Sequence, residues 1–214
     1  MQTVALVESH YLPSLEYFFA LLPFKEVMLE ANEYFVKQTF RNRCFINTAQ
    51  GVKMLSVPLL DRHGKILMKE VMIEPGNKWR NNHWRTIESA YRKAPYFDYY
   101  AEGLKKVLYQ GHEFLIDLNR DLMSFCLRHI GFQKSISATL AYEIRVEENI
   151  FDLRSVISCK KPFSERRIYQ PLKYYQVFGS EFVPNPSLLD LLFCEGPRAG
   201  EILRASSQVR TNKI

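Results

Sequence analysis

The chemically richest stretch of the chain runs from Trp79 to Tyr100, where two tryptophans, a histidine and four tyrosines lie among charges. At about 100° per residue, its apolar side chains form one helical face. That face carries Trp79, His83, Ile87, Ala90 and Tyr91, with Trp84 at its margin. Two interpretations of His83 stay open. It is either a core histidine bonded to a backbone carbonyl, or the titratable group of a pocket, whose ordinary pKa of about 6.5 suits a general base.

A second candidate is the basic segment "KQTFRNRCFI", which begins at Lys37. In an extended chain alternate side chains share a face, so Lys37, Arg41 and Arg43 would point the same way. Three cations on one face suit a phosphate or a carboxylate, because a guanidinium can bind either with two hydrogen bonds. Asn42 adds a side chain that both donates and accepts. The alternative is an exposed strand that its charges keep soluble.

No other motif indicates a specific chemistry. The sequence lacks the glycine-rich loops that bind nucleotide phosphates, the G-x-S-x-G nucleophile elbow and the H-E-x-x-H zinc motif. Its five histidines are scattered, so we predict neither a metal site nor a cofactor. The four cysteines lie far apart and form no C-x-x-C pair. This spacing favours reduced thiols in the core or at the surface, and a reducing compartment.

The elements that must position these groups follow from the hydrophobic pattern. Strands are predicted at residues 3–9, 25–32, 44–48, 53–58, 67–75 and 135–145. Helices are predicted at residues 11–22 with Pro13 in the first turn, 77–92, 97–110 with an interruption at Gly103, 112–130 with Gly131 as cap, and 188–195 with Ser187 as cap. Residues 147–170 are basic and weakly patterned, which predicts a mobile loop.

We therefore expect one α+β domain over residues 1–205, with mixed strands in its N-terminal part and a helical middle. A polar tail follows at 206–214. The alternative is a three-layer α/β arrangement, because the strand and helix within residues 3–24 would begin a parallel sheet. Hydrophobic residues at 47% and charged residues at 24% agree with a globular chain of either kind.

Charge and hydropathy indicate which kinds of molecule the protein binds. A net charge of +6 and a pI of about 9.1 favour acidic partners. The cations are spread along the chain, whereas a dedicated nucleic-acid binder usually carries a denser stripe. We find no signal peptide and no apolar run approaching the ~18 residues of a membrane span. We expect a cytoplasmic protein that binds a small-molecule substrate and not nucleic acid, and the sequence leaves its oligomeric state open.

Five stretches, taken in order, resemble the WbqC-like protein family: "YLPSLEYF", "KQTFRNRCFI", "LSVPL", "HWRTIESAYRKAPYFDYY" and "YYQVFGSEFVPNPSLLDLLFCEGP". The resemblance covers most of the chain except roughly residues 132–169. The Gln-Pro that often precedes the family's tyrosine is absent before Tyr11, so the match assigns no role to His10. Cys194 stands where an asparagine is common. The resemblance implies a bacterial protein encoded among surface-polysaccharide (O-antigen) genes, and for one branch of the family a glycyl transfer to an amino sugar.

Together these observations predict an N-acyl or aminoacyl (glycyl) transferase that acts on a nucleotide-linked amino sugar in O-antigen biosynthesis. His83 is the predicted catalytic base. The predicted substrate-binding residues are Tyr11, Lys37, Arg41, Asn42, Arg43, Trp79, Trp84, Tyr91 and Tyr96. One alternative is a non-catalytic protein that binds a nucleotide sugar or glycan precursor with the same residues but needs no base. Another is a nucleic-acid-binding protein, whose affinity would fall steeply with salt.

Overall fold

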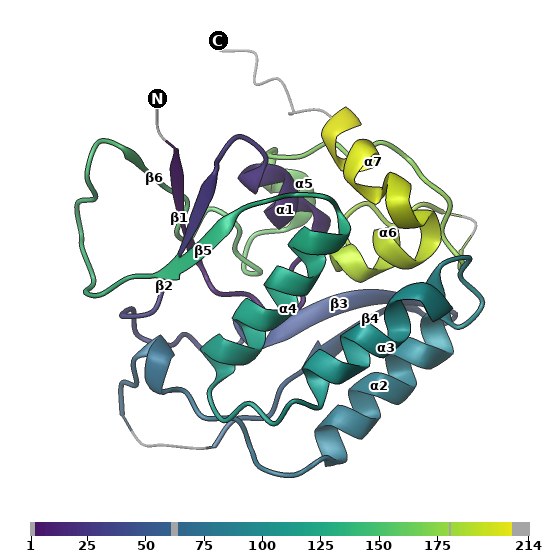
Figure 1. The fold of residues 1–214 in the computed structure, drawn as a ribbon, viewed down its shortest axis with the longest axis horizontal. Helices are drawn as coiled ribbons and strands as arrows, with labels where there is room; N and C mark the ends of the chain where they lie inside the picture. Colours follow the sequence, from purple (N-terminus) through teal and green to yellow (C-terminus); the bar gives the residue numbers. More distant parts are fainter. Residues whose placement is uncertain (1–2, 61–63, 180, 207–214) are drawn as a thin grey trace.

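The computed structural model describes residues 3–60, 64–179 and 181–206, which form the elements labelled in Figure 1. The strands are β1 (Val4–Glu8), β2 (Glu26–Glu30), β3 (Arg43–Thr48), β4 (Gly51–Ser56), β5 (Ser135–Ala138) and β6 (Ile150–Asp152). The α-helices are α1 (Leu15–Leu21), α2 (Lys78–Tyr91), α3 (Phe97–Leu108), α4 (Leu115–His129), α5 (Phe163–Arg166), α6 (Leu188–Glu195) and α7 (Ala199–Ala205). Two 3-10 turns, η1 (Met68–Glu70) and η2 (Gly196–Arg198), complete the described elements.

A parallel sheet of four strands, in the order β5-β2-β1-β6, forms one end of the molecule. Buried side chains run along β1 because it lies between two neighbours, and α1 carries the chain from β1 back to β2. Strand β1 and helix α1 therefore do begin a parallel sheet, and this feature was the reason for the α/β alternative. A separate antiparallel hairpin and the helical middle make the whole chain α+β, as predicted.

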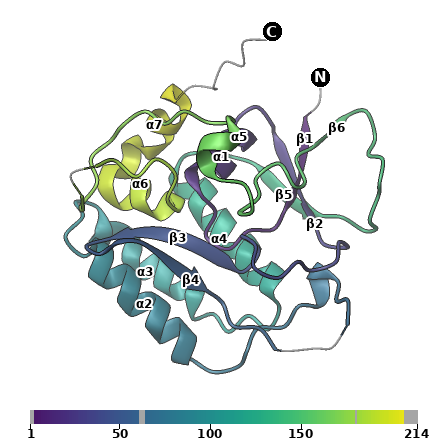
Figure 2. The same cartoon turned by 180° about the vertical axis from the view of Figure 1, so that it is seen from behind.

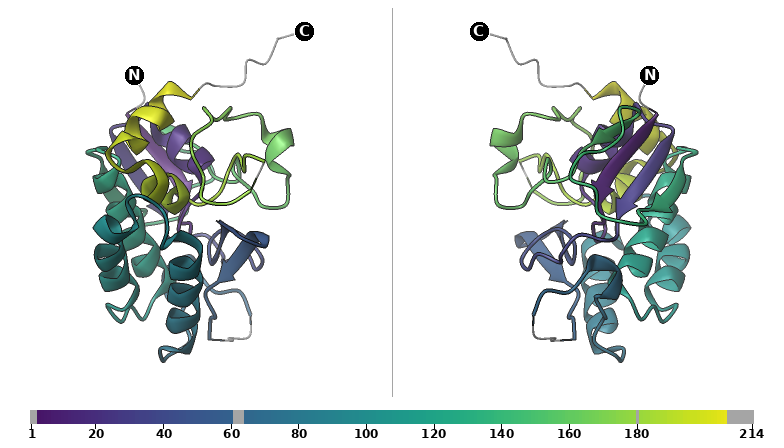
Figure 3. Two further views of the ribbon diagram at one scale, coloured as in Figure 1. Left: turned by 90° about the vertical axis from the view of Figure 1, so that its right-hand side faces the viewer. Right: turned by 90° about the vertical axis from the view of Figure 1, so that its left-hand side faces the viewer.

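The hairpin of β3 and β4 lies against α2 at the opposite end of the molecule, as the two side views in Figure 3 show. Its register pairs Arg43 with Ser56 and Thr48 with Gly51. Gly51 has a φ of 94°, a left-handed conformation that glycine adopts without steric cost, so the predicted turn is confirmed. The hairpin places Ser56 directly beside the buried face of α2.

The predicted helical middle is confirmed, and its aromatic face is packed inside the molecule. Trp84 contacts Phe97 of α3, and both Tyr91 and Phe97 contact Phe193 of α6. Figure 2, seen from behind, shows β3 and β4 crossing this group of helices. Most of the aromatic density of the segment therefore builds the core between α2, α3, α6 and the hairpin.

Three predictions of secondary structure are wrong. Residues 67–75 form a 3-10 turn and isolated bridges rather than an exposed strand, because the buried side chains Met68, Val71 and Ile73 do not alternate. Residues 147–170 contain β6 and α5. Helix α3 continues through Gly103, where a Cβ would lie 3.1 Å from the Phe125 ring, so the glycine permits close helix packing.

The bounds of two elements also need correction. Strand β5 ends at Ala138, although the sequence predicted a strand as far as residue 145. Helix α1 begins at Leu15 after Ser14, so Pro13 precedes the helix and does not lie in its first turn. Ser206, the first residue of the predicted tail, is buried, and its hydroxyl accepts a hydrogen bond from the Leu172 amide at 3.0 Å. Residues 207–214 lie outside the described part. No helix among the described residues has both the length and the apolar character needed to cross a bilayer.

Candidate functional site

His83 lies where the sequence places it, on the inner face of α2, and both of its ring nitrogens are engaged. Nδ1 lies 2.9 Å from the Tyr11 hydroxyl, and Nε2 lies 3.2 Å from the Ser56 carbonyl oxygen. A carbonyl only accepts, so Nε2–H donates to Ser56 and Nδ1 accepts from Tyr11. Burial lowers the pKa of His83 to about 4, against the hydrogen bond to Ser56, which raises it. This is the geometry expected of a core histidine.

The predicted aromatic binding residues lie largely inside the core. Trp79 packs edge-on against His83 with ring centroids 5.2 Å apart, and Trp79, Trp84 and Tyr91 are 7%, 9% and 0% exposed. Tyr96 is half-buried, and its ring covers Gly196 so closely that a Cβ there would lie 2.4 Å from a ring carbon. The rings of the two tryptophans and Tyr91 therefore offer no open surface on which a base or sugar could stack.

The basic segment is not extended, so the predicted single face of cations is wrong. Gln38 adopts a left-handed conformation, with a φ of 61°, and residues 37–42 form consecutive turns. The turns send Lys37 and Arg43 to one side and Arg41 to another, since they line different cavities. Backbone strain of this kind in a residue other than glycine is concentrated at functional sites.

Lys37, Asn42 and Arg43 together line a cavity of about 450 Å³, which we call the basic cavity. Its volume falls within the roughly 300–1,000 Å³ typical of small-molecule sites. Asn42 donates to the Val57 carbonyl at 3.0 Å, but its Oδ1 and the Nε of Arg43 are buried without a partner among the described residues. Buried polar atoms are normally hydrogen-bonded, so these two atoms indicate a place where a ligand completes the network.

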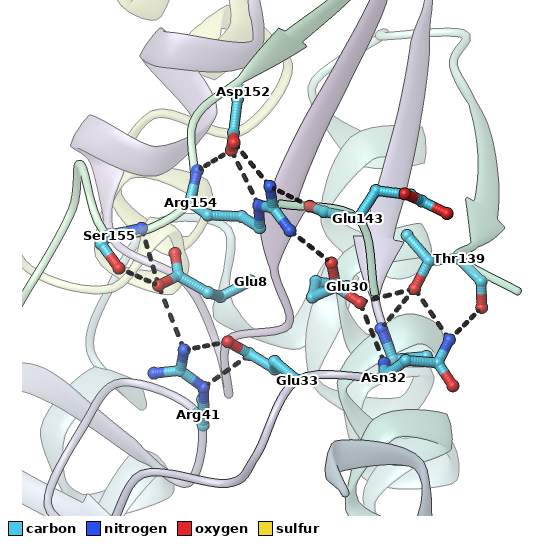
Figure 4. Close-up of polar contacts among 11 residues, drawn as sticks. Glu8, Glu30, Asn32, Glu33, Arg41, Thr139, Glu143, Asp152, Arg154 and Ser155 are labelled. Atoms are coloured by element: carbon cyan, nitrogen blue, oxygen red, sulfur yellow. Dashed lines mark hydrogen bonds and ion pairs between the residues drawn. The ribbon is translucent and has the colours of Figure 1, made fainter. Parts of the chain in front are cut away.

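Arg41 belongs to a buried ion cluster at the ends of the parallel strands, drawn in Figure 4. Its Nε and Nη2 bind the two carboxylate oxygens of Glu33 at 2.7 and 2.6 Å, and Nη2 also lies 3.1 Å from Oε1 of Glu8. Two carboxylates thus surround one guanidinium whose side chain is 7% exposed. The charge of Arg41 is already compensated inside the protein, which is a different environment from the exposed cation that the sequence predicted.

The same cluster borders a second cavity of about 230 Å³, which we call the strand-end pocket. Its polar walls are Glu8, His10, Arg41, Ser155 and Lys160, with Cys159 and Phe40 beside them. Glu8 is the last residue of β1, and Ser155 follows the end of β6. Sequence reasoning missed Glu8, Ser155 and Lys160 because it read residues 147–170 as a loop and gave no weight to the polar residues that directly follow the first strand.

A third cavity, of about 280 Å³, shares Phe40 and Cys159 with the strand-end pocket and is lined also by Tyr11 and Arg166. Arg166 is bound to the buried carboxylate of Glu16 at 2.6 Å, which anchors the segment around α5 to α1. Among the residues that the structure describes, no group of three or more His, Cys, Asp or Glu side chains is arranged to hold a metal ion.

Comparisons with known proteins agree with the resemblance seen in the sequence. The chain is similar to "Uncharacterized protein Rv1507c" of Mycobacterium tuberculosis, with 28% identity over 240 residues that cover 97% of this chain and all of the other. No solved structure gives a significant match. The model of the WbqC-like protein family matches residues 8–171, which include the basic cavity and the strand-end pocket almost completely. The chain belongs to the WbqC-like protein family.

Proposed function

We propose that the protein is an N-acyl or aminoacyl transferase that acts on a nucleotide-linked amino sugar, in the biosynthesis of a surface polysaccharide such as O-antigen. The observation that carries this proposal is the basic cavity, which is lined by Lys37, Asn42 and Arg43 and in which two buried polar atoms lack partners among the described residues. Cations beside an amide group suit the diphosphate of a nucleotide sugar, because a guanidinium or ammonium donates hydrogen bonds to phosphate oxygens.

The reaction needs an activated acyl donor as the second substrate. The sugar amine attacks the acyl carbonyl carbon, so a C–N bond forms and the bond from that carbon to the donor's leaving heteroatom breaks. The leaving group departs with the electron pair, and the amine proton passes to a base. His83, the base that the sequence suggests, has both ring nitrogens in hydrogen bonds within the protein. In this proposal His83 holds Tyr11 and the hairpin in position rather than accepting the proton.

The second candidate is a protein that binds a nucleotide sugar without turning it over. The engaged nitrogens of His83 favour it, because binding in the basic cavity requires no base. The two candidates share the same ligand and the same cavity. They differ only in whether a product forms when an acyl donor is added.

The test uses a nucleoside-diphosphate amino sugar as probe, with its N-acetylated form, an acyl-coenzyme A, glycyl donors and a short RNA alongside. Calorimetry measures binding and mass spectrometry measures product. The double variant Lys37→Gln/Arg43→Gln should weaken binding of the nucleotide sugar at least tenfold. The matched control Arg92→Gln/Lys93→Gln removes the same two charges from the exposed end of α2 and should change the affinity less than twofold.

Equal losses of affinity in the two double variants would show that net charge alone attracts the nucleotide sugar. This result would contradict the basic cavity as its binding site. Binding without product for any donor would support the non-catalytic candidate. Tight binding of RNA with a steep salt dependence, and none of the nucleotide sugar, would contradict both candidates.

A further inference from the structure

The strand-end pocket lies at the position where parallel sheets most often bind ligands. In open α/β sheets, ligands occupy the crevice beyond the carboxyl ends of the strands, where the strand order reverses. Here β2 lies on one side of β1, and the later strand β6 lies on the other side of β1, so the strand order reverses at β1. Glu8 ends β1 at this reversal, and Ser155 lies just beyond β6.

The pocket is lined by polar side chains whose hydrogen-bonding capacity is only partly used within the described residues. His10 is 4% exposed, and neither ring nitrogen has a hydrogen-bond partner among the described residues. Every contact from Arg41 and Ser155 to the Glu8 carboxylate is made to Oε1, so neither of these residues occupies Oε2. The contacts of Arg41 with Glu8 and Glu33 are made by Nε and Nη2, and Figure 4 draws no contact from Nη1 to either carboxylate. Acceptors and a donor therefore face the same small space.

The electrostatics of the pocket favour a neutral group over a cation. Burial, then Arg41 and Arg166, lower the pKa of His10 to about 3, so the ring is neutral at pH 7. Burial would likewise lower the pKa of an amine bound beside His10, and a neutral amine is the form that attacks a carbonyl carbon. Burial raises the pKa of Glu8, against Arg41, which lowers it.

The size of the pocket suits a single sugar ring. Its volume of about 230 Å³ is below the roughly 300 Å³ at which drug-sized sites begin. The walls combine acceptors, a donor and the apolar Phe40, which suits a sugar with hydroxyl groups and one amine. The basic cavity is lined by Lys37 and Gln38, and the strand-end pocket by the adjacent Val36 and Thr39. The two cavities are therefore lined by adjacent residues of the same turn.

We propose that the strand-end pocket binds a monosaccharide through its free amine, with the Glu8 carboxylate accepting an N–H and His10 and Arg41 binding hydroxyl groups. This assignment rests on the proposed transferase function and deepens it, since it names the part of the substrate that carries the nucleophile. In the transfer, the amine forms the C–N bond with the acyl carbon, the leaving group of the activated acyl donor departs with the electron pair, and Glu8 receives the proton.

The experiment titrates the whole protein with glucosamine, glucose and N-acetylglucosamine, and measures dissociation constants by NMR at pH 8. Glucosamine should bind at least fivefold more tightly than N-acetylglucosamine, because acetylation removes the basic nitrogen and adds bulk. His10→Asn and Glu8→Gln should each weaken glucosamine binding at least fivefold. His129→Asn changes a histidine that lines none of the three cavities described above, and it should leave glucosamine binding within twofold. Lys37→Gln/Arg43→Gln alters the basic cavity and tests whether glucosamine binds there instead.

The inference is overturned if no monosaccharide binds, if His10→Asn has no effect, or if only the basic-cavity variant loses glucosamine. His10→Asn breaks no hydrogen bond among the described residues, so it keeps the test decisive even where Glu8→Gln fails to fold. Failure of the proposed transferase function can be distinguished from failure of the pocket assignment. If glucosamine binding depends on His10 but no donor gives a product, the pocket assignment is supported and the transferase function is contradicted. If product forms and His10→Asn leaves turnover unchanged, the transferase function is supported and the pocket assignment is contradicted.

Discussion

His10 and His83 are both almost completely buried, at 4% and 6% exposure, but their ring nitrogens have opposite surroundings. The nitrogens of His83 contact Tyr11 and Ser56 within hydrogen-bond distance. Those of His10 contact no polar partner among the described residues, while the ring packs between Tyr17 and Phe40. Burial alone therefore does not separate a structural histidine from one that is available to a ligand. The difference lies in whether the fold satisfies the polar atoms.

The same contrast separates the arginines of the basic segment. Arg41 is held by Glu8 and Glu33, whereas the Nε of Arg43 is buried without a partner among the described residues. The two residues are only two positions apart, and the turn between Lys37 and Asn42 gives them different surroundings. Each of the following changes tests whether satisfied groups carry stability and unsatisfied groups carry binding.

The largest effect is expected for Arg41→Met. The substitution leaves the carboxylates of Glu8 and Glu33 buried without their cation, and breaking a buried ion pair in this way costs about 3–5 kcal/mol. Urea denaturation should show this loss in the free energy of unfolding. Lys37→Met, a change of the same type at an exposed position, should cost less than about 0.5 kcal/mol. Similar losses in the two variants would contradict the structural role of Arg41.

The second effect is that His83 makes the folded protein less stable as the pH falls. Its pKa is about 4 in the folded protein and about 6.5 when unfolded. Between these values the unfolded chain binds more protons, so stability falls as the pH drops from 6.5 to 4, by about 3 kcal/mol in total. Glu8 and Asp190, whose pKa values are raised mainly by burial, act in the opposite direction. Comparing His83→Leu with the wild type across this range isolates the histidine; parallel pH profiles would contradict the lowered pKa.

The smallest effect, and the most direct test of the contrast, compares His83→Leu with His10→Asn at pH 7.5. Removing His83 leaves the Tyr11 hydroxyl and the Ser56 carbonyl without their partner, which should cost about 1–3 kcal/mol. His10→Asn breaks no hydrogen bond among the described residues, so its cost should stay below about 1 kcal/mol. Thermal and urea unfolding of both variants decide the point. A larger loss for His10→Asn would reverse the assignment of the two histidines.

Much of the fold could be predicted because it depends on local patterns. The inward face of α2, the Gly51 turn and the Ser187 cap, which accepts from the Leu189 amide, all follow from spacing and residue type. Residues 147–170 could not be assigned, because long-range ion pairs organise them. Arg154 binds Glu30, 124 positions away, and Arg166 binds Glu16, 150 positions away, so a local pattern reveals neither partner. The order of strands in the sheet has the same origin.

The sequence by itself favoured the α+β class, and it determined the helical period that puts the aromatic residues on one face of α2 and the resemblance to the WbqC-like protein family, since periodicity, turn residues and ordered motifs are properties of the chain. Only the tertiary structure decided which polar groups remain unsatisfied. That property depends on partners distant in the chain: Tyr11 lies 72 positions from His83, and Ser155 lies 147 positions from Glu8. The turns over residues 37–42 separate Arg41 from Lys37 and Arg43. The return of β6 beside β1 brings Ser155 to Glu8.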